Sequence, residues 1–133
     1  MTVLALDHVN IATDDVVATA RFFVEKLGLR ASLPGESTLP EDAQWLHDPD
    51  GRAVIHLARP ELIARAGHTV GKGPGSGAVH HIAFSCTGHD ATLAALEAQG
   101  LVERTFTVES MALRQIFTRD PNGILVELNF FGD

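Results

Sequence analysis

Residues 6–15 read LDHVNIATDD and residues 79–90 read VHHIAFSCTGHD, so the chain carries two versions of one pattern. In each version a histidine, His8 or His81, is followed by alternating apolar and small residues. This period of two is typical of a β-strand whose two faces meet different surroundings. The repeat predicts two modules that share one fold.

A helix is expected after each of these strands. Thr13 or Asp14 is the expected N-cap of the first helix and Gly28 its expected end, and Thr87 and Gly100 are their counterparts in the second. The first helix also carries an apolar stripe at three- and four-residue spacing, as an amphipathic helix does. The stripe comprises Val16, Ala20, Phe23 and Leu27.

Each version ends in a second shared pattern, HDPDGRAVIHLA at residues 47–58 and RDPNGILVELNF at residues 119–130. Asp-Pro-Asp-Gly and Asp-Pro-Asn-Gly favour hairpin turns, because Pro presets one backbone angle and Asn or Gly accepts the positive φ that follows. The predicted order is therefore βαβββ in each module. The remaining strands are expected at residues 29–33 and 44–47, and at residues 101–109 and 113–118.

The predicted fold class is α+β, with two βαβββ modules related by pseudo-twofold symmetry and a curled mixed sheet that forms a metal-binding cavity. The first module spans residues 1–58 and the second residues 78–133, within one domain. Residues 59–77 join them and contain GKGPGSG. A phosphate-binding loop needs Ser or Thr after its Gly-Lys pair, and Gly73 stands there instead, so a flexible linker or lid is the better interpretation.

The composition points to a small-molecule partner. The 133-residue chain has 10 basic and 17 acidic residues, a net charge of −7 that argues against binding nucleic acid. No apolar run approaches the ~20 residues that span a bilayer, and no secretory leader is visible, so no membrane contact and a cytoplasmic location are expected. The single cysteine, Cys86, is expected to be a core thiol.

Four polar residues occupy matching places in the repeat. His8 aligns with His81, and His56 within AVIHLA aligns with Glu127 within ILVELN. Two modules related by a pseudo-twofold axis would bring these four side chains together. Imidazole and carboxylate groups that converge in a partly apolar cavity form a divalent-metal site, for which Zn, Ni, Fe, Co or Mn is suitable.

Two alternatives stay open at this site. His8, His81 and Glu127 alone would make a two-histidine, one-carboxylate triad, and His56 would then be a hydrogen-bonded core residue. Glu127 lies in an apolar run, where an unpaired carboxylate is costly, so a cationic partner is expected for it. Surface or local capping roles are expected for three other histidines, His47, His68 and His89, whereas His80 is expected to line the cavity or a dimer contact.

Three segments together resemble the vicinal-oxygen-chelate superfamily, which includes glyoxalase I, methylmalonyl-CoA epimerase, the extradiol dioxygenases and bleomycin-resistance proteins. The segments are LDHVNIATDD, HHIAFSC and DPNGILVELNF, and they extend over nearly the whole chain. The resemblance implies a metal that chelates two adjacent oxygens of a substrate and stabilises an enediolate. It also implies a homodimer, with the metal site held within one chain or shared between two.

The resemblance favours a glyoxalase- or epimerase-type lyase or isomerase acting on a small oxygenated substrate. An Fe(II) dioxygenase of extradiol type and a non-catalytic binding or resistance protein are the alternatives. Glyoxalase I and the epimerase resemble each other in carrying Glu or Gln where this chain has His56, so proton transfer here falls to Glu127 or to an unliganded His56. Arg114 or Arg119 is a candidate for holding an anionic group of the substrate, or else a solvated strand charge.

Overall fold

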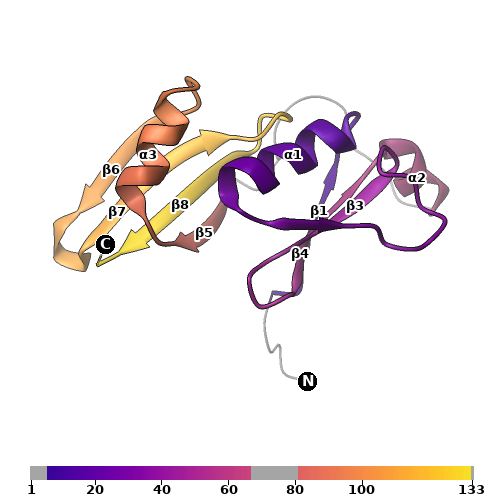
Figure 1. Cartoon of the computed structure of the whole chain (residues 1–133), viewed down its shortest axis with the longest axis horizontal. Coiled ribbons are helices and arrows are strands. Elements are labelled where there is room, and N and C mark those ends of the chain that lie inside the picture. The colour runs from indigo at the N-terminus through magenta and orange to yellow at the C-terminus, as the bar shows by residue number, and fades with distance from the viewer. Residues whose placement is uncertain (1–5, 67–80, 133) are drawn as a thin grey trace. The chain divides into compact units, whose positions relative to one another are not determined.

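The structure is a computed structural model that describes residues 6–66 and 81–132 (Figure 1). The chain divides into two compact units, Met1–Lys72 and Gly73–Asp133, and each contains one four-stranded mixed sheet with helices. The α+β class and the two-module organisation are thereby confirmed. Residues 67–77 of the predicted linker, with its GKGPGSG sequence, lie outside the described residues.

The first module follows the predicted βαβββ order and adds a short helix. Its sheet has the strand order β1-β4-β3-β2, in which β1 runs parallel to β4 and the other pairs are antiparallel. The added helix, α2, occupies the start of the predicted linker, where Pro60 stands in the first turn. The elements are β1 (Val9–Ala12), α1 (Val16–Leu27), β2 (Arg30–Ser32), β3 (Ala43–His47), β4 (Ala53–Ala58) and α2 (Pro60–Arg65).

The N-cap of helix α1 lies one residue after Asp14 and two after Thr13, the two predicted caps. Asp15 is the N-cap, and its Oδ1 accepts a 2.8 Å hydrogen bond from the backbone N–H of Ala18. The Thr13 side chain is buried instead, with its hydroxyl 2.9 Å from that of Thr19. Gly28 ends the helix as predicted, at a φ of 73° that glycine adopts without steric cost. The helix packs on β3, β4 and β2 through Val16, Thr19, Ala20, Phe22 and Phe23.

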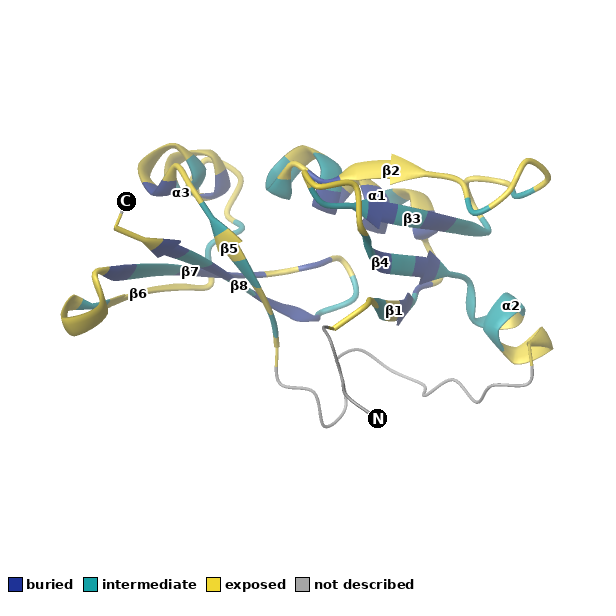
Figure 2. Cartoon of the chain, turned by 90° about the horizontal axis from the view of Figure 1, so that it is seen from below, coloured by how far each residue is buried: buried dark blue, intermediate teal, exposed yellow. Residues whose placement is uncertain are grey.

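The second module repeats this plan. Its sheet has the order β5-β8-β7-β6, again with one parallel pair, β5 and β8. Helix α3 lies over one face of this sheet (Figures 1 and 2). The predicted cap Thr87 is wrong, since Gly88 holds that position without a side-chain hydrogen bond. The elements are β5 (Ile82–Cys86), α3 (His89–Glu97), β6 (Arg104–Val108), the 3-10 turn η1 (Glu109–Met111), β7 (Leu113–Arg119) and β8 (Leu125–Phe131).

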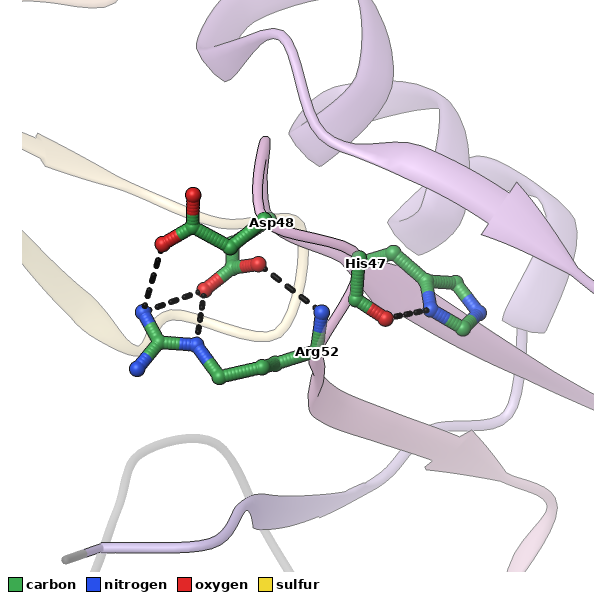
Figure 3. A network of polar contacts seen from close by, with 5 residues as sticks. His47, Asp48 and Arg52 are labelled. Atoms are coloured by element: carbon green, nitrogen blue, oxygen red, sulfur yellow. Dashed lines mark hydrogen bonds and ion pairs between the residues drawn. The ribbon is translucent and has the colours of Figure 1, made fainter.

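The two hairpin turns have matching backbone bonds. Gly51 N–H donates to Asp48 O, and Gly123 N–H donates to Asp120 O, both at 3.0 Å. In each turn the aspartate Oδ1 also accepts the backbone N–H four residues later, from Arg52 at 2.9 Å or Ile124 at 2.8 Å. The Arg52 side chain closes over Asp48 as well (Figure 3). The DPDG and DPNG sequences thus form the predicted turns.

Burial alternates along β3 and β5 and along most of β4 and β8, as the period of two predicts (Figure 2). In β5, Ile82 and Phe84 are half-buried, whereas Ala83 and Ser85 between them are exposed. Cys86 is also half-buried, and this burial raises the pKa of its thiol. One face of each sheet therefore packs under its helix, and the other face carries the candidate site residues.

Candidate functional site

The strand registers confirm the alignment of the candidate residues within the repeat. Asn10 on β1 lies opposite His56 on β4, and Ala83 on β5 lies opposite Glu127 on β8. His8 precedes Asn10 by two residues, as His81 precedes Ala83, so each histidine is on the same face of its sheet as its partner. In each module, therefore, a histidine just before the first strand is paired with a polar residue on the neighbouring parallel strand.

In the first module the pair is a stack of rings. The His8 and His56 rings have centroids 3.8 Å apart and planes 16° apart. Trp45, which lies directly across from His56 on β3, stacks on the same imidazole at 4.7 Å and 17°. The His56 ring therefore has an aromatic ring on both faces, and contacts with other groups are left to its edge.

The two rings have different polar surroundings. His8 Nδ1 lies 2.6 Å from Asp7 Oδ2, a contact that favours a proton on Nδ1. Burial lowers the pKa of His56, the neighbouring His8 and His47 lower it further, and Asp7 opposes them in part. His56 is accordingly a neutral imidazole at neutral pH, which is the form that binds metals.

The stacked arrangement limits how the first pair can bind an ion. An imidazole nitrogen directs its lone pair in the plane of the ring, and its bond to a metal is ~2.0–2.1 Å long. Two nearly parallel rings 3.8 Å apart have no common point that lies in both planes at that distance. In this arrangement His8 or His56 can bind a metal ion, but the two cannot bind the same one.

In the second module the pair is an imidazole and a carboxylate. His81 Nε2 lies 3.3 Å from Glu127 Oε2. The Glu127 side chain is 13% exposed and that of His81 37%. A cationic partner was expected for this carboxylate, and the side chain that lies beside it in the structure is the imidazole of His81.

Two residues of the second module that were not predicted from the sequence contact Glu127 or its partner. The Gln115 side-chain amide on β7 donates 2.8 Å hydrogen bonds to Glu127 Oε1 and to Asn129 Oδ1. Gln115 and Asn129 lie directly opposite each other in the β7–β8 hairpin, and both are half-buried. The signal that points to them is the hairpin register, which can be counted from the DPNG turn.

Two of the remaining histidines have local partners. His47 Nε2 lies 2.7 Å from Ser32 Oγ and its Nδ1 lies 3.1 Å from Gly51 O, in keeping with the expected local role. Of the surface or local role expected for His89, the surface position is wrong, because its ring is buried edge-on against Phe130. It does have a local contact, since its Nδ1 lies 3.0 Å from Asp90 Oδ1. His68 and His80 lie outside the described residues.

The two arginines considered for an anionic substrate group are both engaged by carboxylates. Arg114 Nη1 donates to Asp90 at 2.7 Å, and Arg119 Nη2 donates to Glu103 at 3.0 Å. Each arginine is therefore already part of an ion pair in this structure.

The four predicted ligands occur as two pairs, each described within its own module. Within either module, the described residues include no group of three or more His, Cys, Asp or Glu side chains arranged to hold a metal ion. The donor types nevertheless suit a borderline divalent metal, since the pairs offer imidazole nitrogens and one carboxylate with an oxygen next to His81. None of the described helices is long and apolar enough to cross a bilayer.

The fold is similar to several solved structures. Lactoylglutathione lyase from Agrobacterium tumefaciens has a TM-score of 0.70 at 20% identity, covering 95% of this chain and 92% of that one. A virulence protein from Salmonella typhimurium has a TM-score of 0.72 at 23% identity, covering 98% and 99%. A fosfomycin resistance protein from Listeria monocytogenes has a TM-score of 0.67 at 15% identity, covering 97% and 94%. At these identities the similarity shows the fold alone.

The sequence itself shows the family. A comparison with curated proteins finds no match. The family described as the Glyoxalase/Bleomycin resistance protein/Dioxygenase superfamily, by contrast, matches residues 5–128, nearly the whole chain. The protein therefore belongs to the Glyoxalase/Bleomycin resistance protein/Dioxygenase superfamily.

Proposed function

We propose that this protein is a metal-dependent enzyme of glyoxalase or epimerase type, a lyase or isomerase that acts on a small oxygenated substrate. The observation that carries the proposal is the pair His81 and Glu127, an imidazole nitrogen and a carboxylate oxygen 3.3 Å apart. A second histidine, His8, stands two residues before Asn10 of β1, the position that matches His81 in the other module, and its Nδ1 contacts Asp7.

We assign His8, His81 and Glu127 as the ligands of one divalent ion, which is Zn, Ni, Fe, Co or Mn. When bound, such an ion acts as a Lewis acid and stabilises the negative charge that develops on two adjacent substrate oxygens, as in an enediolate. His56 is a fourth candidate ligand, which joins the set once its ring leaves the stack with His8. This three-ligand set leaves coordination positions for the substrate oxygens.

Proton transfer is assigned to His56 or Glu127. The His56 ring is held between Trp45 and His8, so its edge is presented in a fixed direction. The neutral imidazole has one unprotonated nitrogen that can take a proton from a carbon next to a carbonyl group and return it. Glu127 is the alternative proton acceptor, but its Oε2 would then have to leave the metal ion, because Oε1 accepts a hydrogen bond from Gln115.

Metal analysis of the purified protein beside a His81→Ala variant tests the centre of this proposal. We expect about one divalent ion per chain in the wild type after reconstitution, and loss of that ion in the variant. Turnover of methylglyoxal with a thiol under anaerobic conditions would support the lyase assignment. The proposal fails if neither protein binds stoichiometric metal, which would favour a non-catalytic binding protein.

The same preparations separate the dioxygenase alternative. An extradiol dioxygenase would bind Fe(II) and consume O₂ with a catechol, so O₂ uptake in that assay would replace the lyase assignment. We also propose a homodimer, as the family resemblance implies, for which light scattering at micromolar concentration is the measurement. A monomer would contradict a metal site shared between two chains.

A further inference from the structure

Gln115 is bound on both sides of its amide nitrogen. Its Nε2 carries two protons, and they point to Glu127 Oε1 and Asn129 Oδ1, each at 2.8 Å. Asn129 is the cross-strand neighbour of Gln115, and Glu127 lies two residues before it on the same face of β8. The Gln115 amide therefore has its orientation fixed by one neighbour while it holds the other.

Glu127 is consequently held by both of its oxygens. Oε1 accepts the amide hydrogen bond, and Oε2 lies 3.3 Å from His81 Nε2. A carboxylate on a half-buried strand would otherwise rotate among several side-chain conformations, each with a different direction for Oε2. With Oε1 occupied, the carboxylate presents a single oxygen beside the imidazole.

The corresponding positions of the first module carry alanines instead of amide side chains. Ala43 on β3 lies opposite Ala58 on β4, two residues away from Trp45 and His56 along their strands. In the second module the same row is formed by Gln115 and Asn129 opposite each other, next to Phe117 and Glu127. Two amides thus replace two methyl groups in the module whose polar residue is a carboxylate.

We infer that Gln115, anchored by Asn129, is a positioning residue that orients Glu127 to bind a divalent metal ion through Oε2 alone, together with His81. The inference rests on the proposed function, because it concerns the same metal ligands. Hydrogen bonds to a ligating carboxylate fix its orientation, and their loss typically weakens metal binding ~10–100-fold.

The test compares Gln115→Met with wild type. Methionine has nearly the size of glutamine but donates no hydrogen bond, so the side-chain volume is preserved while the Oε1 contact is lost. Co(II) is the probe, because its absorption spectrum reports the number and type of ligands while a titration gives the affinity. Gln99→Met is the matched control, since Gln99 is exposed in the turn after α3 and its side-chain amide donates to Ala95 O.

We expect Gln115→Met to bind Co(II) about tenfold more weakly than wild type and with a changed spectrum, because Glu127 can then bind through both oxygens. Gln99→Met is expected to match wild type in both readouts. Asn129→Ala, which removes the anchor but leaves the Gln115 amide, should give a smaller loss in the same direction. This second variant also serves if Gln115→Met fails to fold.

Three outcomes would overturn the inference, and they differ in what they say of the proposed function. If wild type binds Co(II) and both variants bind it with the same affinity and spectrum, the positioning role is wrong and the metal site stands. If Gln99→Met loses as much affinity as Gln115→Met, the effect is not specific to Glu127. If wild type binds no Co(II), the proposed function and the inference fall together.

Discussion

The two modules place a polar residue at the same register but restrain it by different means. His56 faces Asn10 across a parallel strand pair, as Glu127 faces Ala83. His56 is restrained by aromatic rings on both faces, whereas Glu127 is restrained by an amide on one oxygen and an imidazole beside the other.

The difference follows from charge. A neutral imidazole is stabilised by contacts with its ring faces, and burial keeps it neutral by lowering its pKa. A half-buried carboxylate needs hydrogen-bond donors, because removing its charge from water without them costs several kcal/mol. A duplicated scaffold can therefore carry two different polar groups only if the neighbouring row of residues changes with them.

The largest expected difference between the modules concerns metal binding. His81→Ala is expected to weaken binding of a divalent ion by at least ~100-fold, since direct ligands contribute more than the residues that orient them. His56→Phe keeps a ring in the stack and is expected to cost less than ~10-fold, because His8 and His56 cannot bind the same ion while stacked. Calorimetric titration of both variants with Zn²⁺ measures the difference.

An equal loss of metal affinity in the two variants would contradict this expected difference. It would mean that His56 leaves its stack and joins the ligands when metal binds. Thermal melting of the metal-free variants is the control, because His81 is exposed and its removal is expected to leave the folded module intact.

The next difference concerns the aromatic residues opposite the two polar groups. Phe117 lies across from Glu127 and is 6% exposed, with the Arg104 guanidinium 4.3 Å from its ring centre. Phe117→Ala is expected to destabilise the protein by about 3–5 kcal/mol, as for a buried aromatic residue. Trp45→Ala is expected to cost about 1–2 kcal/mol, because the half-buried ring loses mainly its stacking on His56. Urea unfolding measures the free energy of unfolding of both variants. A larger loss in Trp45→Ala would contradict the expectation that Phe117 contributes more to stability than Trp45.

The two turn aspartates differ next. Asp120 is 4% exposed and accepts the backbone N–H groups of Asn122 and Ile124. Asp120→Ala leaves both donors without this partner and is expected to cost about 1–3 kcal/mol. Asp48→Ala is expected to cost less, because the partner it loses is the exposed Arg52. Equal shifts in melting temperature would show that the turn backbone, and not burial, determines the contribution.

Much of this fold could be predicted because both copies of the repeat carry the same sequence patterns for strands, helices and turns. Period-two strands, apolar helical stripes and Asp-Pro turns recur in the same order, and they specify βαβββ twice. The pairing of His8 with His56 and of His81 with Glu127 follows from the same alternation. The N-cap of the first helix was harder to predict, since Thr13 is buried against Thr19 and Asp15 caps the helix in its place.

The surroundings of the site differ in how far they could be predicted. In the second hairpin the register continues without interruption from the DPNG turn, so the position of Gln115 opposite Asn129 can be counted from the sequence. In the first hairpin an irregularity between Leu46 and His47 shifts the register. No residue in HDPDGRAV marks such a bulge, so the stacking of Trp45 on His56 could not be counted in the same way.

The smallest expected difference is the pH dependence that His56 adds to the first module. Its pKa is lower in the folded protein than the ordinary value of 6.5, above all because of burial. As the pH falls below 6.5 the unfolded chain therefore takes up a proton before the folded one, and the free energy of unfolding decreases until the pH is below the folded pKa. His56→Phe retains the stack and removes this titration.

Urea unfolding of the metal-free proteins at pH 7.5 and 5.5 measures this effect. Wild type should lose more stability than His56→Phe, and the difference should be small because the edge of the ring is open to solvent, which screens its charge. An identical loss in both proteins would mean that the stacked His56 ring is as well hydrated as in the unfolded chain. Burial would then not explain why the first module restrains a neutral ring by its faces whereas the second restrains a carboxylate by hydrogen-bond donors.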